Sequence, residues 1–457
     1  MGRVLILPAL IAPGRGAPCG FRPDRTSFRG ASRVHERTSL RPALALGLAM
    51  FLPAFGTHGL NAGRGDLAAA LDLPAGDERV RVAMAIFALA GALAYLVVGA
   101  VGDRIGLRRT LVGGVVGFLA AHLLLLVQRP LAAALGCPPW WLFLGGRIAA
   151  GLAGGAITVS ANALGGALYV AAQRGRALSL VWLGVPLALV VGVPLPLLLG
   201  GAWRELPERI APWCGEPYTA VALLAALLAA AFVLRAVPDA PPAPAAASGA
   251  TPTAAPSPLP RLADSWWIYA TSLLMPLGVF PLIVSADAWT ESAYGFDRPA
   301  RAGLLFLLGA ASVAGGLGSS LVADRLGRRR TLLASLASFA LLAALLPFSG
   351  AAAYVALAAL LGLVSTVRQG PFQALASFVA DQRGRGRFSA RILVASQLGI
   401  SGGQFLGDRL LSHAGGAAKL SLVPIAAVTV GCTVAALLLA WRLREPAPEP
   451  APRVAAG

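Results

Sequence analysis

Two arginines lie inside long apolar segments of the chain, where a charged side chain is costly unless it faces a partner, water or a ligand. Arg147 occurs in GRIAAGLAGGA and Arg368 in STVRQGPFQALASF, 221 residues later. Each could bind an anionic group or take part in ion coupling. Arg147 lies 27 residues before Arg174, whereas Arg368 lies only 15 before Arg383. The two need not share one depth, and we expect Arg368 to be the deeper.

The surroundings of Arg368 favour a place in a central cavity. Gln369 and Gln373 add hydrogen-bonding groups beside it. Gly370 and Pro371 should break or kink the helix and expose backbone carbonyls. The alternative interpretation is a structural arginine bonded to the kinked backbone.

Arg147 is followed by Gly151 and Gly155, a spacing that allows another helix to approach closely. One interpretation of Arg147 is a cation that faces the cavity and contributes to substrate binding or proton coupling. The other is a side chain that extends along its helix to the outer headgroups.

A few other polar groups occur in or beside apolar segments. His58 could titrate near physiological pH, although a hydrogen-bonded histidine at the membrane interface is the simpler interpretation. Asn162 is a further candidate for the cavity. Asp287 and Glu291 close an apolar segment and are expected to be solvated loop acids. No acidic residue falls clearly at mid-membrane, so the sequence names no proton acceptor.

A charged run occurs twice, as GDRIGLRRTLVGG and ADRLGRRRTLLAS. A glycine in each run permits a tight turn between two helices. An aspartate just beyond a span needs water, a cation or a helix N-terminus nearby. The residues of interest are Gly99, Asp103, Arg104, Gly106 and Arg108 in the first copy and Asp324, Arg325, Gly327, Arg328 and Arg329 in the second.

The elements that must position these residues are membrane spans. Of the 457 residues, 57% are hydrophobic and 13% charged, and the mean hydropathy is +0.73, which indicates an integral membrane protein. The net charge of +18 comes from arginines concentrated in alternate inter-helix segments. This positive-inside asymmetry excludes nucleic-acid binding as the explanation of the charge and places both termini in the cytoplasm.

Twelve apolar segments are expected to span the bilayer, six on each side of a Pro/Ala-rich stretch. The expected fold is therefore all-α, with two pseudo-symmetric six-helix bundles. The spans are expected at about 42–62, 82–102, 109–128, 140–169, 177–200, 217–236, 266–284, 300–323, 331–349, 352–378, 389–412 and 418–441. The domains are expected to be a disordered basic tail (1–40), a first bundle (41–236), a cytoplasmic linker (237–264), a second bundle (265–442) and a disordered tail (443–457).

Both charged runs resemble the major facilitator superfamily, whose loop after the second helix of a half has the pattern G-x-x-x-D-R-x-G-R-R/K-x-x-L. The first copy departs at Leu107 and the second at Ser320. Arg147 with its glycines is similar to the superfamily's fourth-helix pattern. The resemblance covers about residues 42–442 and implies the major facilitator fold with alternating access.

The resemblance also implies contacts for the two aspartates. Asp103 should approach the start of the helix near Arg391, and Asp324 the start of the helix near Ala177. These contacts would be latches that break as the halves rock. The alternative is that the charged runs only anchor the topology.

The fifth span, LGVPLALVVGVPLPLLLGGAWRE, is rich in glycine and proline. It resembles loosely the G-x-x-x-G-P-x-x-G-G stretch of superfamily exporters. Ala188 replaces the first glycine, and Gly192 and Pro194 are separated by one residue. This favours export modestly, since kinks alone also explain such prolines.

No pattern in the sequence predicts catalysis, a cofactor or a metal site. The four cysteines have no metal-ligand spacing, and no phosphate-binding Gly-Lys loop occurs. Cys137 and Cys214 both fall in segments expected outside, where a disulfide could form. The alternative is two independent thiols.

The sequence therefore predicts a monomeric, multi-pass transporter of the inner membrane, and not an enzyme. Its expected function is proton-coupled export, as an antiporter, of small hydrophobic or amphipathic compounds. Uptake or exchange of a small organic anion is the alternative, favoured by two arginines without acidic partners. A non-transporting receptor or scaffold that keeps the fold is the alternative from another class.

Overall fold

The structure is a computed structural model that describes residues 39–60, 67–69, 71–74, 77–169, 171–204, 217–238, 262–377, 379, 385–413 and 422–443. The chain divides into two units, Met1–Ser39 and Leu40–Gly457, and all the described helices belong to the second. The expected basic N-terminal tail, most of the linker and the C-terminal tail lie outside the described residues.

Every regular element of the described residues is helical, which confirms the all-α expectation. The first half contains α2 (Arg41–His58), α4 (Glu78–Ile105), α5 (Leu107–Leu126), α6 (Gln128–Leu135), α7 (Pro139–Ala167), α8 (Ala171–Trp182), α9 (Gly184–Leu187), η2 (Ala188–Gly192), α10 (Pro194–Arg204) and α12 (Pro217–Ala236). The second half contains α13 (Leu262–Tyr294), α14 (Arg298–Leu326), α15 (Arg328–Leu345), η3 (Leu346–Phe348), α16 (Ala351–Val367), α17 (Gln369–Ser377), α18 (Arg385–His413) and α19 (Leu422–Ala440).

The helices agree with twelve membrane spans. Ten spans of the described chain are long and apolar enough to cross a bilayer, and α2 and α18 occupy the two remaining expected places. Two spans are broken helices. The fifth comprises α8, α9, η2 and α10, and the tenth comprises α16 and α17.

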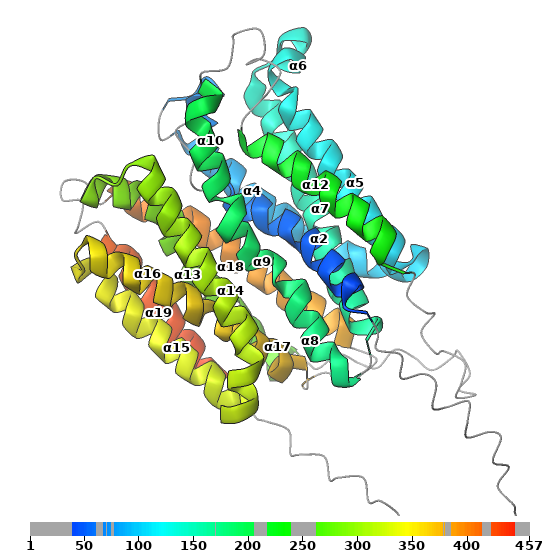
Figure 1. The fold of residues 1–457 in the computed structure, drawn as a ribbon, viewed down its shortest axis with the longest axis vertical. Helices are drawn as coiled ribbons and strands as arrows, with labels where there is room; N and C mark the ends of the chain where they lie inside the picture. Colours follow the sequence, from blue (N-terminus) through cyan, green and yellow to red (C-terminus); the bar gives the residue numbers. More distant parts are fainter. Residues whose placement is uncertain are drawn as a thin grey trace, which may run out of the picture. The chain divides into compact units, whose positions relative to one another are not determined.

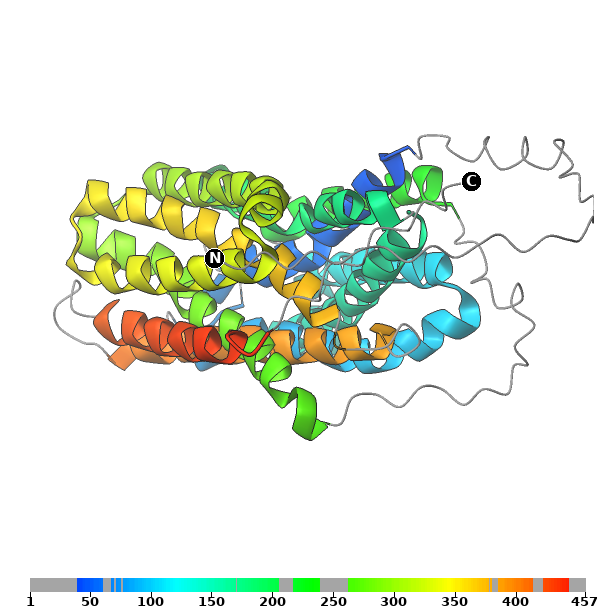
Figure 2. The same cartoon turned by 90° about the horizontal axis from the view of Figure 1, so that it is seen from below.

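The helices of each half pack mainly against one another. Figures 1 and 2 show the second half, coloured from yellow-green to red, to one side of the first, coloured from blue to green. The largest apolar core cluster contains residues of the first half only, and two further clusters belong to the second half. A fourth, small cluster joins the fifth span to α14.

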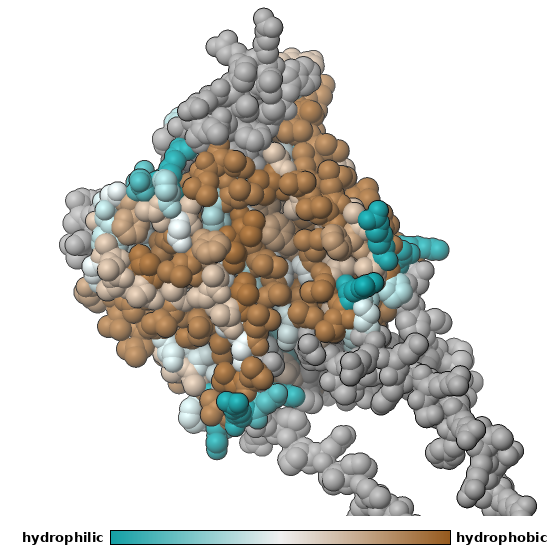
Figure 3. Space-filling model, in the orientation of Figure 1, coloured by the Kyte–Doolittle hydropathy of each residue, from teal (hydrophilic) through white to brown (hydrophobic). Residues whose placement is uncertain are grey.

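The outer surface suits a lipid environment. Leu96, Val97, Leu341 and Leu438 are each at least 60% exposed. Figure 3 shows a largely apolar face, with hydrophilic residues gathered near the ends of the helices. So large an exposed apolar surface is unfavourable in water and is explained by contact with a bilayer.

Candidate functional site

Arg147 is fully buried inside the first half, and each of its three guanidinium nitrogens donates a hydrogen bond. Nε bonds to the Ala83 carbonyl at 3.1 Å, Nη1 to the Tyr218 hydroxyl at 3.0 Å and Nη2 to the Gly56 carbonyl at 2.9 Å. The Phe87 ring lies against the cation, 4.4 Å from centroid to Cζ. Arg147 thereby links α7 to α2, α4 and α12, and its side chain does not extend to the headgroups.

The Tyr218 hydroxyl extends this buried network to a histidine. His122 Nδ1 lies 2.9 Å from the Phe118 carbonyl, and Nε2 lies 3.4 Å from the Tyr218 hydroxyl. A carbonyl can only accept, so Nδ1 carries the proton and Nε2 accepts from Tyr218. Sequence reasoning named neither His122 nor Tyr218, which lie 96 residues apart.

The two glycines after Arg147 lie where α7 contacts α4. A Cβ at Gly151 would collide with the Phe87 carbonyl oxygen. A Cβ at Gly155 would lie 2.5 Å from Ala94 Cβ and 2.8 Å from the Gly91 carbonyl oxygen. Since no larger side chain fits, these positions keep α7 close enough for Arg147 to reach Ala83.

Arg368 is also buried, at 1% exposed, but it has few partners. Nη2 donates one long hydrogen bond of 3.5 Å to the Met275 carbonyl of α13. Nε and Nη1 have no hydrogen-bond partner. The ring of Phe339 on α15 lies 4.5 Å from Cζ. The guanidinium group therefore keeps donors free for an anionic or carbonyl group.

The backbone breaks at Arg368, as the sequence predicts from Gly370 and Pro371. α16 ends at Val367 and α17 begins at Gln369. Pro371 has no N–H for the Val367 carbonyl, which accepts a hydrogen bond of 2.9 Å from Ser319 Oγ instead. Gln369 is exposed and Gln373 half-buried, and the structure records no hydrogen bond from either to Arg368.

His58 lies between the two halves. It is 5% exposed and stacks on Phe280 of α13 with ring centroids 5.2 Å apart. Its Nδ1 has no hydrogen-bond partner, and the role of His58 stays a prediction. Asn162 is half-buried and donates to the Thr158 carbonyl of its own helix at 2.9 Å.

One face of α18 bridges the halves, and sequence reasoning missed it. Two glutamines and a serine at spacings of four and three lie on this face. Gln397 Nε2 donates to the Tyr95 hydroxyl at 3.0 Å, Ser401 Oγ to the Ala85 carbonyl at 3.1 Å, and Gln404 Nε2 to the Thr57 carbonyl at 3.1 Å. Polar residues repeated along one face of a membrane span were the available signal.

Near the end of α18, an ion pair also joins this helix to α4. Arg409 Nη2 lies 2.9 Å from Glu78 Oε1 at the start of α4. The preceding residue, Asp77, caps α4 by accepting from the Arg79 backbone N–H at 2.8 Å. The Arg79 side chain also donates to Asp77, and these bonds lower the pKa of the Asp77 carboxyl.

The broken fifth span forms the second contact between the halves. Residues 188–192 are π-helical, and Pro194 starts the next α-helical segment. Gly309 of α14 packs so tightly here that a Cβ would lie 2.5 Å from the Val190 nitrogen. A Cβ at Gly192 would lie 2.5 Å from the Phe55 ring. The glycines allow the fifth span to lie between α2 and α14.

These bridges lie toward one side of the membrane region. α4 begins at Glu78 and ends at the Gly106 turn, whereas its bonds to α18 involve Glu78, Ala85 and Tyr95. α14 likewise packs on the fifth span near the start of α14, at Ala302, and not at the Gly327 turn that ends α14. The described bridges to Glu78, Ala85 and Thr57 are therefore toward the face opposite the arginine-rich turns, whereas Tyr95 lies just past the middle of α4.

The two charged runs form equivalent turns. Gly106 and Gly327 adopt φ values of +94° and +86°, which favour glycine. Arg108 Nη2 donates to the Leu234 carbonyl at 3.2 Å, at the end of α12. Arg329 Nη2 donates to the carbonyl of Trp441 at 2.9 Å, just after α19. Each arginine therefore caps the last helix of its own half.

The latch contacts implied by the resemblance remain predictions. Asp324 is exposed, and no ion pair involving it occurs among the described residues. The side chain of Asp103 and the surroundings of Gly99 lie outside the described part. Ala177 is buried in α8 and Arg391 is exposed on α18. Further residues of the two runs are exposed: Arg104, Arg325 and Arg328.

Asp287 is not the solvated loop acid expected from the sequence, whereas the Glu291 side chain is 62% exposed and therefore solvated as expected. Both pair with Arg301 of α14, which is only 6% exposed. Asp287 Oδ1 lies 3.5 Å from Arg301 Nε, and the Asp287 side chain is 17% exposed. Because Arg301 comes ten residues after Glu291, on the next helix, spacing alone did not indicate the cluster.

The remaining expectations concern cysteines and metals. Cys137 is a free, half-buried thiol, in agreement with the alternative of two independent thiols, and Cys214 lies outside the described residues, so the possible disulfide stays a prediction. Within the described part of the chain, no three His, Cys, Asp or Glu side chains group as metal ligands.

Comparisons with known proteins address the fold. A family model of the Major Facilitator Superfamily matches residues 43–404. No curated protein matches the chain. The D-xylose-proton symporter has a similar structure, with a TM-score of 0.66 and 15% identity over 89% of this chain and 98% of that chain. The human organic anion transporter MFSD10 (TETRAN) gives a TM-score of 0.61 and 16% identity over 87% and 98%.

Proposed function

The chain belongs to the Major Facilitator Superfamily, and on this premise we propose that it exports small hydrophobic or amphipathic compounds by alternating access, in exchange for protons. Its fold is that of the superfamily's secondary transporters. We place the protein in the inner membrane with both termini in the cytoplasm, because arginine is concentrated in alternate inter-helix segments.

The observation that carries alternating access is the polar face of α18. It joins the halves by a few hydrogen bonds, and such bonds can break without disrupting either bundle. Export is supported by the loose resemblance of the fifth span, where the structure has the π-helical break at Ala188–Gly192.

A cross-linking experiment tests alternating access. Cysteines replacing Ala85 and Ser401, in a variant lacking the four native cysteines, would be joined by a short bifunctional thiol reagent. We expect proteoliposomes to lose transport on cross-linking, while the same reagent leaves the single-cysteine variants active. Full transport by the cross-linked protein would contradict the proposal.

Direction and coupling need a separate measurement. Proteoliposomes with an imposed pH gradient should move an amphipathic dye against its gradient, and a protonophore should abolish this movement. Unchanged movement with the protonophore would refute proton coupling. If no compound is transported at all, the receptor or scaffold alternative is favoured.

Arg368 favours a second candidate, the uptake or exchange of a small organic anion. Its Nε and Nη1 are buried without partners, and a carboxylate could accept from either nitrogen. Here Arg368→Gln should abolish transport of a carboxylate and leave neutral dyes unaffected. Equal loss for both substrates would refute a charge-recognition role.

A further inference from the structure

We propose that a groove between α13 and α18 binds a single-chain amphipathic anion, such as a medium-chain carboxylate, with its headgroup at Arg391 and Tyr269. This inference rests on the proposed function in one respect: of the amphipathic compounds proposed as substrates, it selects the anions. The binding site itself is argued from the groove.

The groove lies along a close contact between α13 and α18, which are also joined at its level by a hydrogen bond of 2.8 Å from Ser272 Oγ to the Ile392 carbonyl. A Cβ at Gly399 would collide with the Leu273 carbonyl oxygen, so the two backbones are in contact there. From this point toward the arginine-rich face, a groove of about 280 Å³ opens. It is lined by Tyr269, Ala270 and Leu273 of α13 and by Arg391, Val394, Ala395 and Leu398 of α18.

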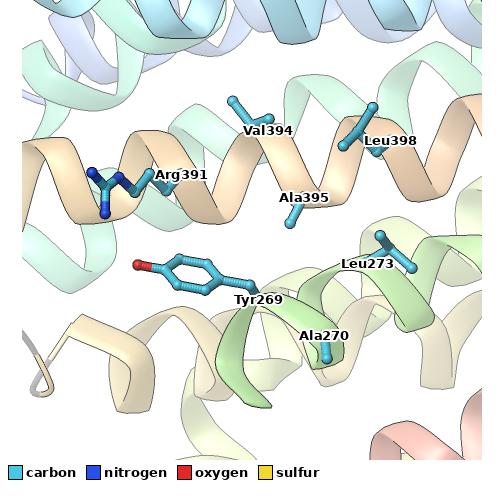
Figure 4. A pocket seen from close by; sticks show the side chains of 7 residues that line it. All are labelled: Tyr269, Ala270, Leu273, Arg391, Val394, Ala395 and Leu398. Atoms are coloured by element: carbon cyan, nitrogen blue, oxygen red, sulfur yellow. The ribbon is translucent and has the colours of Figure 1, made fainter. Parts of the chain in front are cut away.

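The polar groups of the groove lie at one end. Figure 4 shows the Tyr269 hydroxyl and the Arg391 guanidinium group at the same end, with Leu273 and Leu398 toward the other. The Tyr269 hydroxyl is buried without a hydrogen-bond partner. Arg391 is exposed, and no ion pair involving it occurs among the described residues. A carboxylate at this end would accept hydrogen bonds from both side chains.

The rest of the lining selects an apolar tail. The other five residues are alanine, leucine or valine. Arg391 and Leu398 are seven residues apart, which corresponds to about 10 Å along a helix. This length suits one medium alkyl chain, and a groove of about 280 Å³ is too small for a two-chain lipid. A cation would be repelled by Arg391, and a compact hydrophilic anion would gain nothing from the apolar walls.

Binding can be measured without transport. The full chain in phosphatidylcholine nanodiscs would be dialysed against radiolabelled octanoate, with empty nanodiscs as blank. We expect saturable octanoate binding, at least tenfold tighter than that of 1-octanol, which lacks the charge, or of acetate, which lacks the tail. Equal affinity for octanoate and octanol would overturn the headgroup assignment.

Three variants locate the site. Arg391→Gln should weaken octanoate binding at least tenfold and leave octanol binding unchanged. Tyr269→Phe should weaken octanoate binding about threefold to tenfold, because one hydrogen bond is lost. Arg330→Gln, which removes another exposed arginine, is the matched control and should change neither. Since Arg391 and Arg330 are exposed, both variants should fold, as thermal unfolding would verify. Unchanged octanoate affinity in Arg391→Gln would overturn the proposal.

Two further comparisons separate the competing explanations. Phosphatidylglycerol in the nanodiscs should not displace octanoate; displacement would assign the groove to bilayer lipid and overturn the proposal. Asp103→Asn should not tighten octanoate binding; a tenfold gain would mean that the Asp103 carboxylate is the native partner of Arg391. If octanoate binds but no compound is transported, the proposed function is refuted, whereas the assignment of the groove as an octanoate-binding site is still supported.

Discussion

Arg147 and Arg368 lie in corresponding spans, the fourth and the tenth, yet their surroundings differ. Arg147 donates to three acceptors on three helices, whereas Arg368 donates one long bond and leaves two nitrogens unpartnered. α2 packs directly on α7 in the first half, but the equivalent helices α13 and α16 hardly touch. Arg147 is the ninth residue of α7, whereas Arg368 follows the last of the seventeen residues of α16. The two arginines therefore differ both in position along their spans and in bonding: Arg147 links three helices to its own, and Arg368 leaves two nitrogens unpartnered.

The largest effect should come from replacing Arg147 by Met. The Ala83 and Gly56 carbonyls and the Tyr218 hydroxyl would all lose their donor while buried. We expect a loss of about 3 kcal/mol or more in the free energy of unfolding. Unfolding by SDS titration in mixed micelles would measure it. If this variant were as stable as the wild type, the hydrogen bonds of Arg147 would not stabilise the fold, and the contrast with Arg368 would be wrong.

Removal of the Tyr218 hydroxyl should cost less. In Tyr218→Phe, Arg147 Nη1 and His122 Nε2 each lose a partner, so we expect about 1–2 kcal/mol of destabilisation. Tyr269→Phe is the matched control, because the Tyr269 hydroxyl has no partner and its loss should leave stability unchanged. Similar losses in both variants would mean that the hydrogen bonds of Tyr218 carry no stability.

The turns are where the two halves agree, and the expected effects there are small and similar. Arg108→Gln and Arg329→Gln each remove a donor from a carbonyl at a helix end, worth about 0.5–1 kcal/mol. Arg329→Gln should cost slightly more, since Arg329 also lies 5.3 Å from the centroid of the Trp441 ring. The same SDS titration would compare them, and a much larger loss in one variant would show that the turns are not equivalent.

The smallest change should follow Arg368→Met. Only one long hydrogen bond is lost and a buried charge is removed, so we expect unchanged stability or a gain of up to about 1 kcal/mol. SDS titration beside Arg147→Met gives the sharpest contrast. A loss as large as that of Arg147→Met would show that Arg368 is structural after all.

The elements of the fold could be predicted from the sequence. The lengths of the apolar segments predicted the spans. The two glycine turns predicted that the halves are equivalent, and Gly370-Pro371 predicted the break beside Arg368. These features depend on local chemistry, because a proline removes a donor and a glycine permits positive φ wherever they occur.

The partners of the polar groups could not be predicted. Tyr218 reaches Arg147 across 71 residues, and Gln404 reaches Thr57 across 347. Such contacts depend on which face of each helix points toward the neighbouring helices. The sequence of a helix that is apolar on all sides does not indicate which face that is. Asp287 illustrates the same limit, since its position at the end of a span indicated solvent and its actual neighbour is the buried Arg301.

The hydrogen-bond acceptors of the α18 side chains affect which residues can change as the sequence evolves. Ser401 and Gln404 bond to main-chain carbonyls, of Ala85 and Thr57, and these persist whatever side chain replaces either residue. Apart from Tyr95 and Glu78, whose side chains also bond to α18, residues of α2 and α4 can therefore change without removing an acceptor of this closure, whereas a change on α18 alters it at once. Selection on the strength of the seal should act on one helix, which leaves the facing half free to acquire new substrates.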